Sequence, residues 1–476
     1  MNQNLAMERE NVMKGVSVLN CHSIRNRAGR RSKPGIFFRA ALLVGAALVC
    51  SSNLAMAQAG GLDITFGTGG VLTDSVGEFN NSGTSGDVVA VQSDGKIIAA
   101  GTIGFAAGAV RLNTNGTLDS SFGTGGTVTI NFPGSNEGPS QVIGVAIQPD
   151  GKIVAGISNL NADANPLFIL ARLNPDGSLD TTFGSGGVVE TQIGPFGSAA
   201  ASVFALQSDG KILLAGSSAM ARYNTTGQLD STFGSGGIAA IAAASPTAMA
   251  LQPDGKILIA AGGALPASLT APVVGLASPA GVISRYSTSG NIDTTFGISG
   301  EAASVAAASA IVVQIAAGCV STCKILVAGT VVSSLSVSGG NDTGFGLVRY
   351  SSNGNVDTSF GKRGGVITGF APVKTLASAY ALVLQTNGDI VAAGLAGQPS
   401  GAQGDDFALA RYSSSGVIDP TFGSSGKVTT AFGTNAAAIY GLAVQSDGKI
   451  VAAGLSLQSG QSGQVGGLVV ARYLSQ

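Results

Sequence analysis

The chain has a single histidine and no tryptophan. The histidine, His22, lies near the amino terminus, and only 5% of the 476 residues are aromatic and 11% charged. The rest of the chain therefore cannot form a Ser-His-Asp triad, a Cys-His pair, a histidine general base or a histidine metal site. The many glycines stand in G-x-x-G-G patterns before expected strands, which does not match a phosphate-binding loop before a helix.

Glutamate is also scarce. Beyond the amino-terminal segment there are four, each in a different part of the chain: Glu78, Glu137, Glu190 and Glu301. None has a repeated partner, so the sequence offers no evident pair of catalytic carboxylates. We expect a protein without catalytic activity, cofactor or metal. A carboxylate-dependent hydrolase or lyase is the alternative.

Residues 1–57 have the order of features that is typical of a secretory signal peptide. Six basic residues between Arg25 and Arg39 precede the apolar run Ala40–Val49, and the segment ends in Ala55-Met56-Ala57. The apolar run is short for a membrane span. We expect cleavage after Ala57, which places residues 58–476 in the periplasm or outside the cell. An organelle transit peptide is the alternative.

Removal of this leader leaves 17 basic and 24 acidic residues, a net charge near −7. An acidic chain without a basic patch is a poor candidate for nucleic-acid binding. Cys319 and Cys323 are the cysteines that remain, and an oxidising compartment favours a disulfide between them. Two reduced thiols are the alternative; two cysteines alone do not make a metal site.

One sequence pattern recurs seven times after the leader. It reads L-D-x-x-F-G-x-x-G, then an apolar run, then Q-x-D-G-K-I and finally A-R-[LY]. The phenylalanines of the first clause are Phe66, Phe122, Phe183, Phe233, Phe296, Phe360 and Phe422. Their spacing of 50 to 64 residues predicts a repeat architecture.

Each repeat predicts four short antiparallel strands and no helix. In the first complete unit these are 88–91, 97–100, 109–112 and 127–130, and the Asp94-Gly95 pair predicts a type I′ turn between the first two. Four-stranded repeats arranged radially make a β-propeller. The residues after the leader begin with a fourth strand, 70–73, and end with a third, 469–473, so the amino-terminal strand completes the last blade. A linear solenoid would instead need polar capping repeats.

The three clauses of the pattern resemble the delta-60 repeat family over about residues 61–474. The first hairpin also resembles that of WD-type blades, although the Trp-Asp signature is absent. The resemblance implies a seven-bladed propeller. It implies no particular function, because propellers serve both as enzymes and as binding proteins.

Charged residues within the repeat are expected to be structural. Six third-strand arginines are followed eight residues later by an aspartate, as Arg172 is by Asp180, and the seventh, Arg472, is expected to meet Asp63 across the closure. This pattern suggests a charge-assisted bond in every blade. A ring of arginines around the central channel, holding an anion, is the alternative. We expect the phenylalanines to wedge between blades and the lysines of D-G-K-I to be solvated.

The second-to-third and fourth-to-first connections differ between units in length and sequence, whereas the other two turns are nearly constant. Function is commonly carried by variable loops on a rigid scaffold. We therefore place a tentative binding face on the variable connections, with Asp342, Asp405 and Asp406 as candidate residues. The expected partner is a protein or a glycan, bound by a monomer. A surface or matrix protein without a discrete ligand is the alternative.

Overall fold

The computed structural model describes residues 58–73, 88–104, 106–132, 140–159, 167–193, 200–217, 219–242, 245–262, 269, 281–305, 307–315, 319–332, 342–370, 376–397, 404–433, 435–457 and 466–476. The predicted leader, residues 1–57, lies outside these residues, so the predicted cleavage after Ala57 stays a prediction. The described ranges contain 28 strands and no helix, and so no helix that could cross a membrane.

The strands form seven antiparallel four-stranded sheets, or blades, and six of them are built from consecutive strands. Blade 1 comprises β2 (Val88–Val91), β3 (Ile97–Ile103), β4 (Ala106–Leu112) and β5 (Thr127–Ile130). Blade 2 comprises β6 (Ser140–Ile147), β7 (Ile153–Asn159), β8 (Leu167–Leu173) and β9 (Val188–Gln192). Blade 3 comprises β10 (Ala201–Leu206), β11 (Ile212–Gly216), β12 (Ala219–Tyr223) and β13 (Ile238–Ala240). Blade 4 comprises β14 (Pro246–Leu251), β15 (Ile257–Gly262), β16 (Gly281–Tyr286) and β17 (Glu301–Ser304).

Blade 5 comprises β18 (Ala307–Gln314), β19 (Lys324–Val332), β20 (Thr343–Tyr350) and β21 (Gly365–Thr368). Blade 6 comprises β22 (Leu376–Leu384), β23 (Ile390–Gly397), β24 (Asp406–Tyr412) and β25 (Lys427–Thr430). Blade 7 comprises β26 (Ala436–Val444), β27 (Ile450–Leu457), β28 (Gly466–Tyr473) and β1 (Val71–Thr73).

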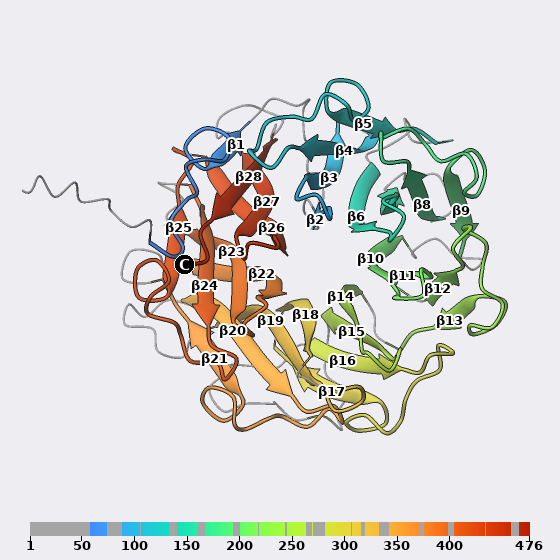
Figure 1. Ribbon diagram of the computed structural model, residues 1–476. Helices are drawn as coiled ribbons and strands as arrows, with labels where there is room; N and C mark the ends of the chain where they lie inside the picture. The colour runs from blue at the N-terminus through green and yellow to red at the C-terminus, as the bar shows by residue number, and fades with distance from the viewer. Residues whose placement is uncertain are drawn as a thin grey trace, which may run out of the picture. The chain divides into compact units, whose positions relative to one another are not determined.

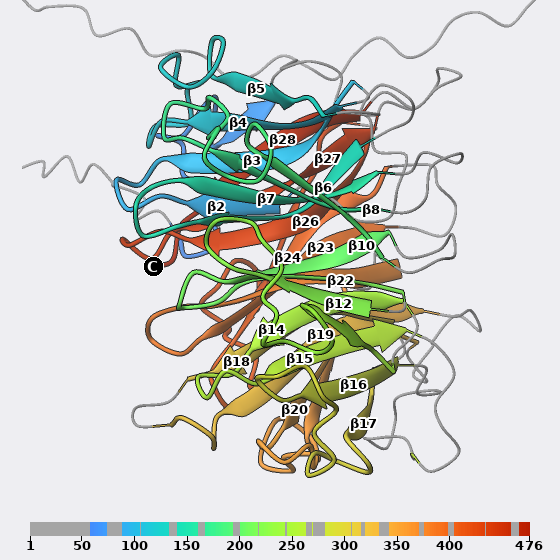
Figure 2. The ribbon, with the colours of Figure 1, turned by 90° about the vertical axis from the view of Figure 1, so that its right-hand side faces the viewer.

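The blades stand in a ring, with the first strand of each blade nearest the centre (Figure 1). Each first strand contacts the first strand of the next blade, and β26 contacts β2. Seen from the side, the strands run between the two ends of the ring (Figure 2). We call the end with the first-to-second and third-to-fourth turns the hairpin face, and the opposite end the variable face. The seven-bladed propeller predicted from the repeats is confirmed.

Two distant parts of the chain complete blade 7. β1 pairs antiparallel with β28, with Val71 opposite Ala471 and Thr73 opposite Val469. The two chain segments also replace the missing third-to-fourth turn, since Gly60 N donates to Leu474 O at 2.8 Å and Leu474 N donates to Gly61 O at 2.9 Å. The predicted ring closure is therefore confirmed, and it leaves no unpaired sheet edge between blades 7 and 1.

The hydrophobic core lies between the blades. One cluster joins Ile98 of blade 1 with Ile153 of blade 2, and similar clusters join the other neighbours. Phe122 is fully buried there. Gly177 of blade 2 packs so closely against it that a Cβ on residue 177 would lie 3.0 Å from the Phe122 ring. The seven repeat phenylalanines therefore wedge between blades as predicted. Each contributes about 1.5–3 kcal/mol by burial.

The predicted type I′ turn in the first hairpins is wrong. Gly95 has a φ of 83°, but Asp94 is not among the residues with positive φ, whereas a type I′ turn needs two. Gln92 N bonds Lys96 O at 2.8 Å, so three residues separate the strands, and Asp94 Oδ1 accepts from Lys96 N at 3.0 Å. Glycine ends a three-residue loop here, and aspartate acts through its side chain.

Candidate functional site

The repeated arginines are buried between blades. Arg172 Nε donates to Asp180 Oδ2 at 2.7 Å, and Nη1 donates to Thr225 O of blade 3 at 2.5 Å. Its guanidinium lies 4.5 Å from the centre of the Phe183 ring. The seven Arg–Asp pairs are Arg111–Asp119, Arg172–Asp180, Arg222–Asp230, Arg285–Asp293, Arg349–Asp357, Arg411–Asp419 and Arg472–Asp63. The alternative of a channel-lining arginine ring is wrong, since the guanidinia are packed in the blade junctions.

The lysines of the hairpins are not simply solvated, which corrects that expectation. Lys152 Nζ lies 2.8 Å from Asp180 Oδ2, so the aspartate is paired with two cations. Equivalent lysine contacts occur in six blades. Blade 6 has Asp389 where the other blades have lysine. Among the ion pairs of the described residues, Asp419 therefore has Arg411 as its one partner.

The repeated aspartates are held ionised. Burial of Asp63 raises its pKa, but hydrogen bonds from Thr65 and Lys449 and the charge of Arg472 outweigh this and lower the pKa to about 2. Asp293 and Asp357 have pKa values of about 2 for the same reasons. Carboxylates fixed in this way stabilise the fold and do not serve as general bases near neutral pH.

The candidate residues of the variable face lie at two neighbouring blade junctions. Asp342 precedes β20, and the next residue, Thr343, accepts a hydrogen bond from Ala377 N of β22 at 2.9 Å. Asp405 precedes β24, and its carbonyl oxygen accepts from Ala437 N of β26 at 2.7 Å. The two junctions are equivalent, so the acidic residues stand where a third strand meets the first strand of the next blade.

Asp405 and Asp406 are half-buried rather than fully exposed, as is Asp342. The Asp405 carboxylate lies over Gly397, where a Cβ would come within 1.7 Å of Oδ1, so a larger residue at the end of β23 would displace the Asp405 side chain. Asp406 lies opposite Ala396 in the ladder between β23 and β24. The acidic pair is thus built into the end of blade 6.

A pair of tyrosines outside the repeat pattern lies near these junctions. Tyr380 of β22 and Tyr440 of β26 stack with their ring centres 5.3 Å apart and their planes at 16°, and both are half-buried. The other five tyrosines are fully buried third-strand residues: Tyr223, Tyr286, Tyr350, Tyr412 and Tyr473. Tyr380 and Tyr440 follow Ala377 and Ala437 by three residues, which is about 10 Å along a strand.

Both tyrosines occupy a β-bulge that recurs around the ring. The ladder between the first two strands skips one residue in six blades. The skipped residues are Ile143, Ser202, Thr247, Ser309, Tyr380 and Tyr440. A bulge redirects a side chain and is frequent beside functional sites. This position lies five residues before the repeat glutamine, and the residue there differs between blades: it is isoleucine, serine, threonine or tyrosine. Sequence reasoning missed it, although aligning the units on that glutamine would have revealed it.

The two glutamates in the described ranges lie on separate sheets. Glu190 in β9 and Glu301 in β17 belong to different blades, and Glu78 and Glu137 lie outside the described residues. Within those same ranges no group of three or more His, Cys, Asp and Glu residues is placed to hold a metal ion.

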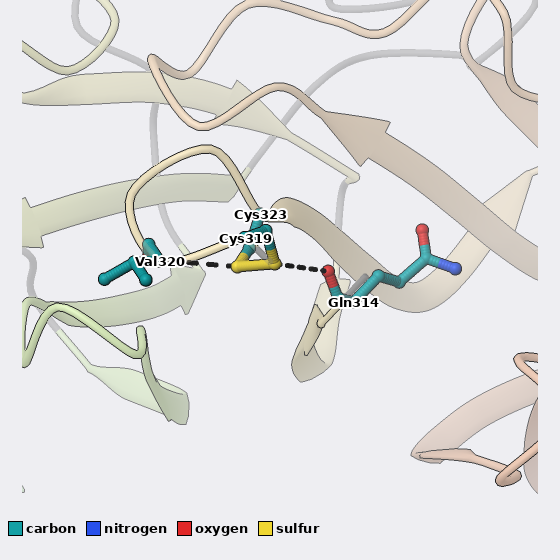
Figure 3. Close-up of a disulfide and its surroundings, with 4 residues drawn as sticks. All are labelled: Gln314, Cys319, Val320 and Cys323. Atoms are coloured by element: carbon teal, nitrogen blue, oxygen red, sulfur yellow. Dashed lines mark hydrogen bonds between the residues drawn. A yellow bond between two sulfur atoms is a disulfide. The ribbon is translucent and has the colours of Figure 1, made fainter. Parts of the chain in front are cut away.

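Cys319 and Cys323 form a disulfide in the first hairpin loop of blade 5, with Cα atoms 5.3 Å apart (Figure 3). The two sulfur atoms lie 3.9 Å from the carbonyl oxygens of Gln314 and Val320 respectively. The bridge closes a loop on the hairpin face, remote in the topology from the acidic residues of the variable face.

The solved structures to which the chain is similar include two lyases and a WD40 β-propeller domain. A selenomethionine-substituted virginiamycin B lyase from Staphylococcus aureus matches with a TM-score of 0.44 and 11% identity, covering 85% of this chain and 99% of that one. The polysaccharide lyase Uly1 matches with 0.42 and 12%, covering 89% and 98%. The WD40 β-propeller domain of Doa1 matches with 0.40 and 12%, covering 86% and 98%. Similarity this distant carries no argument about activity.

None of the curated proteins compared with the chain matches it. Six segments match the family described as "Domain of unknown function (DUF5122) beta-propeller": residues 92–122, 148–183, 207–233, 324–360, 385–422 and 445–475. Five of them begin at the repeat glutamine. Five of them end at the phenylalanine of the L-D-x-x-F-G pattern, and the segment 445–475 ends just after the third strand of blade 7. Together with the seven-bladed ring, these matches show a β-propeller repeat protein, six segments of which are similar to this family.

Proposed function

We propose that the protein is an exported, non-catalytic binding platform that recognises a glycan on the variable face of blades 5 to 7. The observation that carries this proposal is that the repeated side chains have structural contacts, whereas the candidate binding residues stand outside the repeat pattern. The repeated Arg, Asp, Lys and Phe residues are used between blades, whereas Asp342, Asp405, Asp406 and the two bulge tyrosines do not repeat around the ring.

The chemistry of these residues suits a sugar. Carboxylates accept hydrogen bonds from hydroxyl groups, and a tyrosine ring offers an apolar face together with a polar hydroxyl. The separation of about 10 Å along the strand between the acidic junctions and the tyrosines is comparable with one or two sugar rings. Export is supported by the order of features in residues 1–57 and by the disulfide at Cys319 and Cys323.

A test compares the wild type with two double variants, Tyr380→Ser/Tyr440→Ser and Asp405→Asn/Asp406→Asn, on an array of immobilised polysaccharides. Asp447→Asn is the matched control, because Asp447 lies in a hairpin turn of blade 7 and its side chain is 52% exposed. We expect both double variants to lose binding and the control to retain it. Binding by none of the proteins, or equal binding by all four, would contradict the proposal. If the double variants instead lose binding to a protein partner, the ligand is a protein and the glycan proposal is wrong.

A further inference from the structure

The first hairpin of blade 5 carries an insertion. Three residues separate the repeat glutamine from the hairpin lysine, or from Asp389 in blade 6, in the other six blades. In blade 5 nine residues, 315–323, separate Gln314 from Lys324. The family match begins at the glutamine in five blades but at Lys324 in blade 5, so the loop lies outside the shared pattern. The disulfide closes this loop, on which Ile315 and Val320 are 69% and 57% exposed.

A pocket of about 770 Å³ lies between this loop and the first hairpin of blade 6. We call it the insertion pocket. Its apolar wall includes Val313, Ile315 and Leu384 together with the disulfide, and its basic residues are Lys324 and Arg349. The volume falls within the range of pockets that bind small organic molecules.

The insertion pocket differs in charge from its counterpart between blades 7 and 1. That site, of about 490 Å³, also contains a repeat lysine and arginine, but two hairpin aspartates, Asp447 and Asp94, line it as well. In blade 5 the insertion removes the hairpin aspartate, and in blade 6 Asn387 replaces it. No carboxylate is among the described residues that line the insertion pocket. An anion entering there would meet two cations that share the single carboxylate of Asp357, without the two hairpin aspartates that line the counterpart site.

The Lys324 side chain is exposed enough to contact an anion, and its ammonium group can donate a further hydrogen bond. Its Nζ lies 3.1 Å from Asp357 Oδ2, and its side chain is 43% exposed, whereas the five equivalent lysines are 27–33% exposed. An ammonium group has three donors, so pairing with Asp357 leaves capacity for a second acceptor. Arg349 is more firmly engaged, because Nη1 donates to Ser414 O at 2.6 Å and to Gln314 Oε1 at 3.3 Å.

We propose that the insertion pocket binds a small amphipathic organic anion. Its anionic group contacts Lys324, and its apolar body lies against Val313, Ile315 and Leu384. This site is on the hairpin face and is independent of the glycan site proposed above, so either proposal can fail without the other.

The probe is 8-anilinonaphthalene-1-sulfonate, an anion with an aromatic body, titrated by fluorescence against the folded protein. Lys324→Gln is compared with Lys449→Gln, which removes the equivalent lysine from the acidic counterpart site. Both substitutions break the same ion pair with a repeat aspartate, so both should lower the unfolding midpoint alike. We expect Lys324→Gln to weaken probe binding about tenfold and Lys449→Gln to leave it unchanged.

The ligand class is tested by displacing the probe with decanoate, decanol and decylamine. Decanoate should compete best, decanol about tenfold less well, and decylamine least. Replacement of residues 315–323 by Ser-Asp-Gly, the turn of blade 1, should abolish probe binding while the melting transition remains cooperative. Absence of probe binding to the folded wild type, equal weakening by both lysine variants, or equal competition by all three compounds would each overturn the proposal.

Discussion

Replacing Asp180 by asparagine should destabilise the ring strongly, although the side chain barely changes shape. Asp180 Oδ2 accepts from Arg172 Nε at 2.7 Å and from Lys152 Nζ at 2.8 Å, and Oδ1 accepts from Thr182 Oγ1 at 2.7 Å. The side chains of Asp180 and Arg172 are only 5% and 8% exposed. An asparagine can keep the contact with Thr182, but it leaves two neighbouring cations without their counter-charge.

Removing one partner of a buried ion pair costs about 3–5 kcal/mol. With an unfolding entropy of about 2.1 cal/mol/K per residue over roughly 420 residues, this lowers the melting temperature by about 3–6 °C. The control is Asp209→Asn. Asp209 is 52% exposed and lies 3.2 Å from Lys211, so its loss should cost less than about 1 kcal/mol.

The assay is thermal melting followed by circular dichroism, supported by urea unfolding at pH 7. The reasoning is refuted if Asp180→Asn melts within 1 °C of the wild type or if Asp209→Asn shifts the transition equally. A companion variant, Arg172→Lys, keeps the charge but loses the planar group that lies over Phe183 and reaches Thr225 O. It should also destabilise; unchanged melting together with lost anion binding would restore the arginine-ring interpretation.

Three further predictions concern the same framework. Asp389→Lys should raise the unfolding free energy by about 0.5–1 kcal/mol, because it supplies to Asp419 the lysine that the other six blades have; an unchanged urea midpoint would contradict it. Deleting residues 58–73 removes β1 and the buried Phe66, which leaves the edge of β28 unpaired. Molecules should then associate through this edge, and size-exclusion chromatography should detect it. A stable monomer with unchanged melting would disprove the closure argument. Since the folded pKa of Asp63 is about 2, below the unfolded value of about 3.9, its contribution to stability is complete above about pH 5 and is lost as the pH falls through 4 towards 2; urea midpoints that are equal at pH 7 and pH 3 would exclude this.

The architecture could be predicted because the repeat encodes it locally. Apolar runs such as Val88–Val91 and Ile97–Ala100 fixed the strands, and the incomplete units at both ends of the repeat region fixed the closure. The constant spacing indicated the pairing of Arg172 with Asp180, since the aspartate follows the arginine by eight residues in six units, and ring closure indicated the seventh pair, Arg472 with Asp63. The structure extends several strands beyond the predicted bounds, as in β3, which continues to Ile103.

The features that escaped prediction depend on which side chains face one another, within a unit or between units. Lys152 reaches Asp180 because β7 lies beside β8, and the period alone does not show which side chain faces which. Tyr380 and Tyr440 stand sixty residues apart in two units, so their stacking requires the geometry of adjacent first strands. The insertion pocket likewise combines two departures in different units, the long loop of blade 5 and Asn387 of blade 6.

The arginines also link each blade to the next in one direction. Each donates through Nη1 to a carbonyl oxygen of the following blade, and the sequence of contacts ends where it begins, since Arg411 bonds Ser475 O and Arg472 bonds Thr114 O. The two chain segments of blade 7 take the place of one of seven equivalent third-to-fourth turns. The arginine links therefore do not distinguish blade 7 from the other blades. A circular permutant that joins these segments by a short linker and opens another third-to-fourth turn would retain every one of these links.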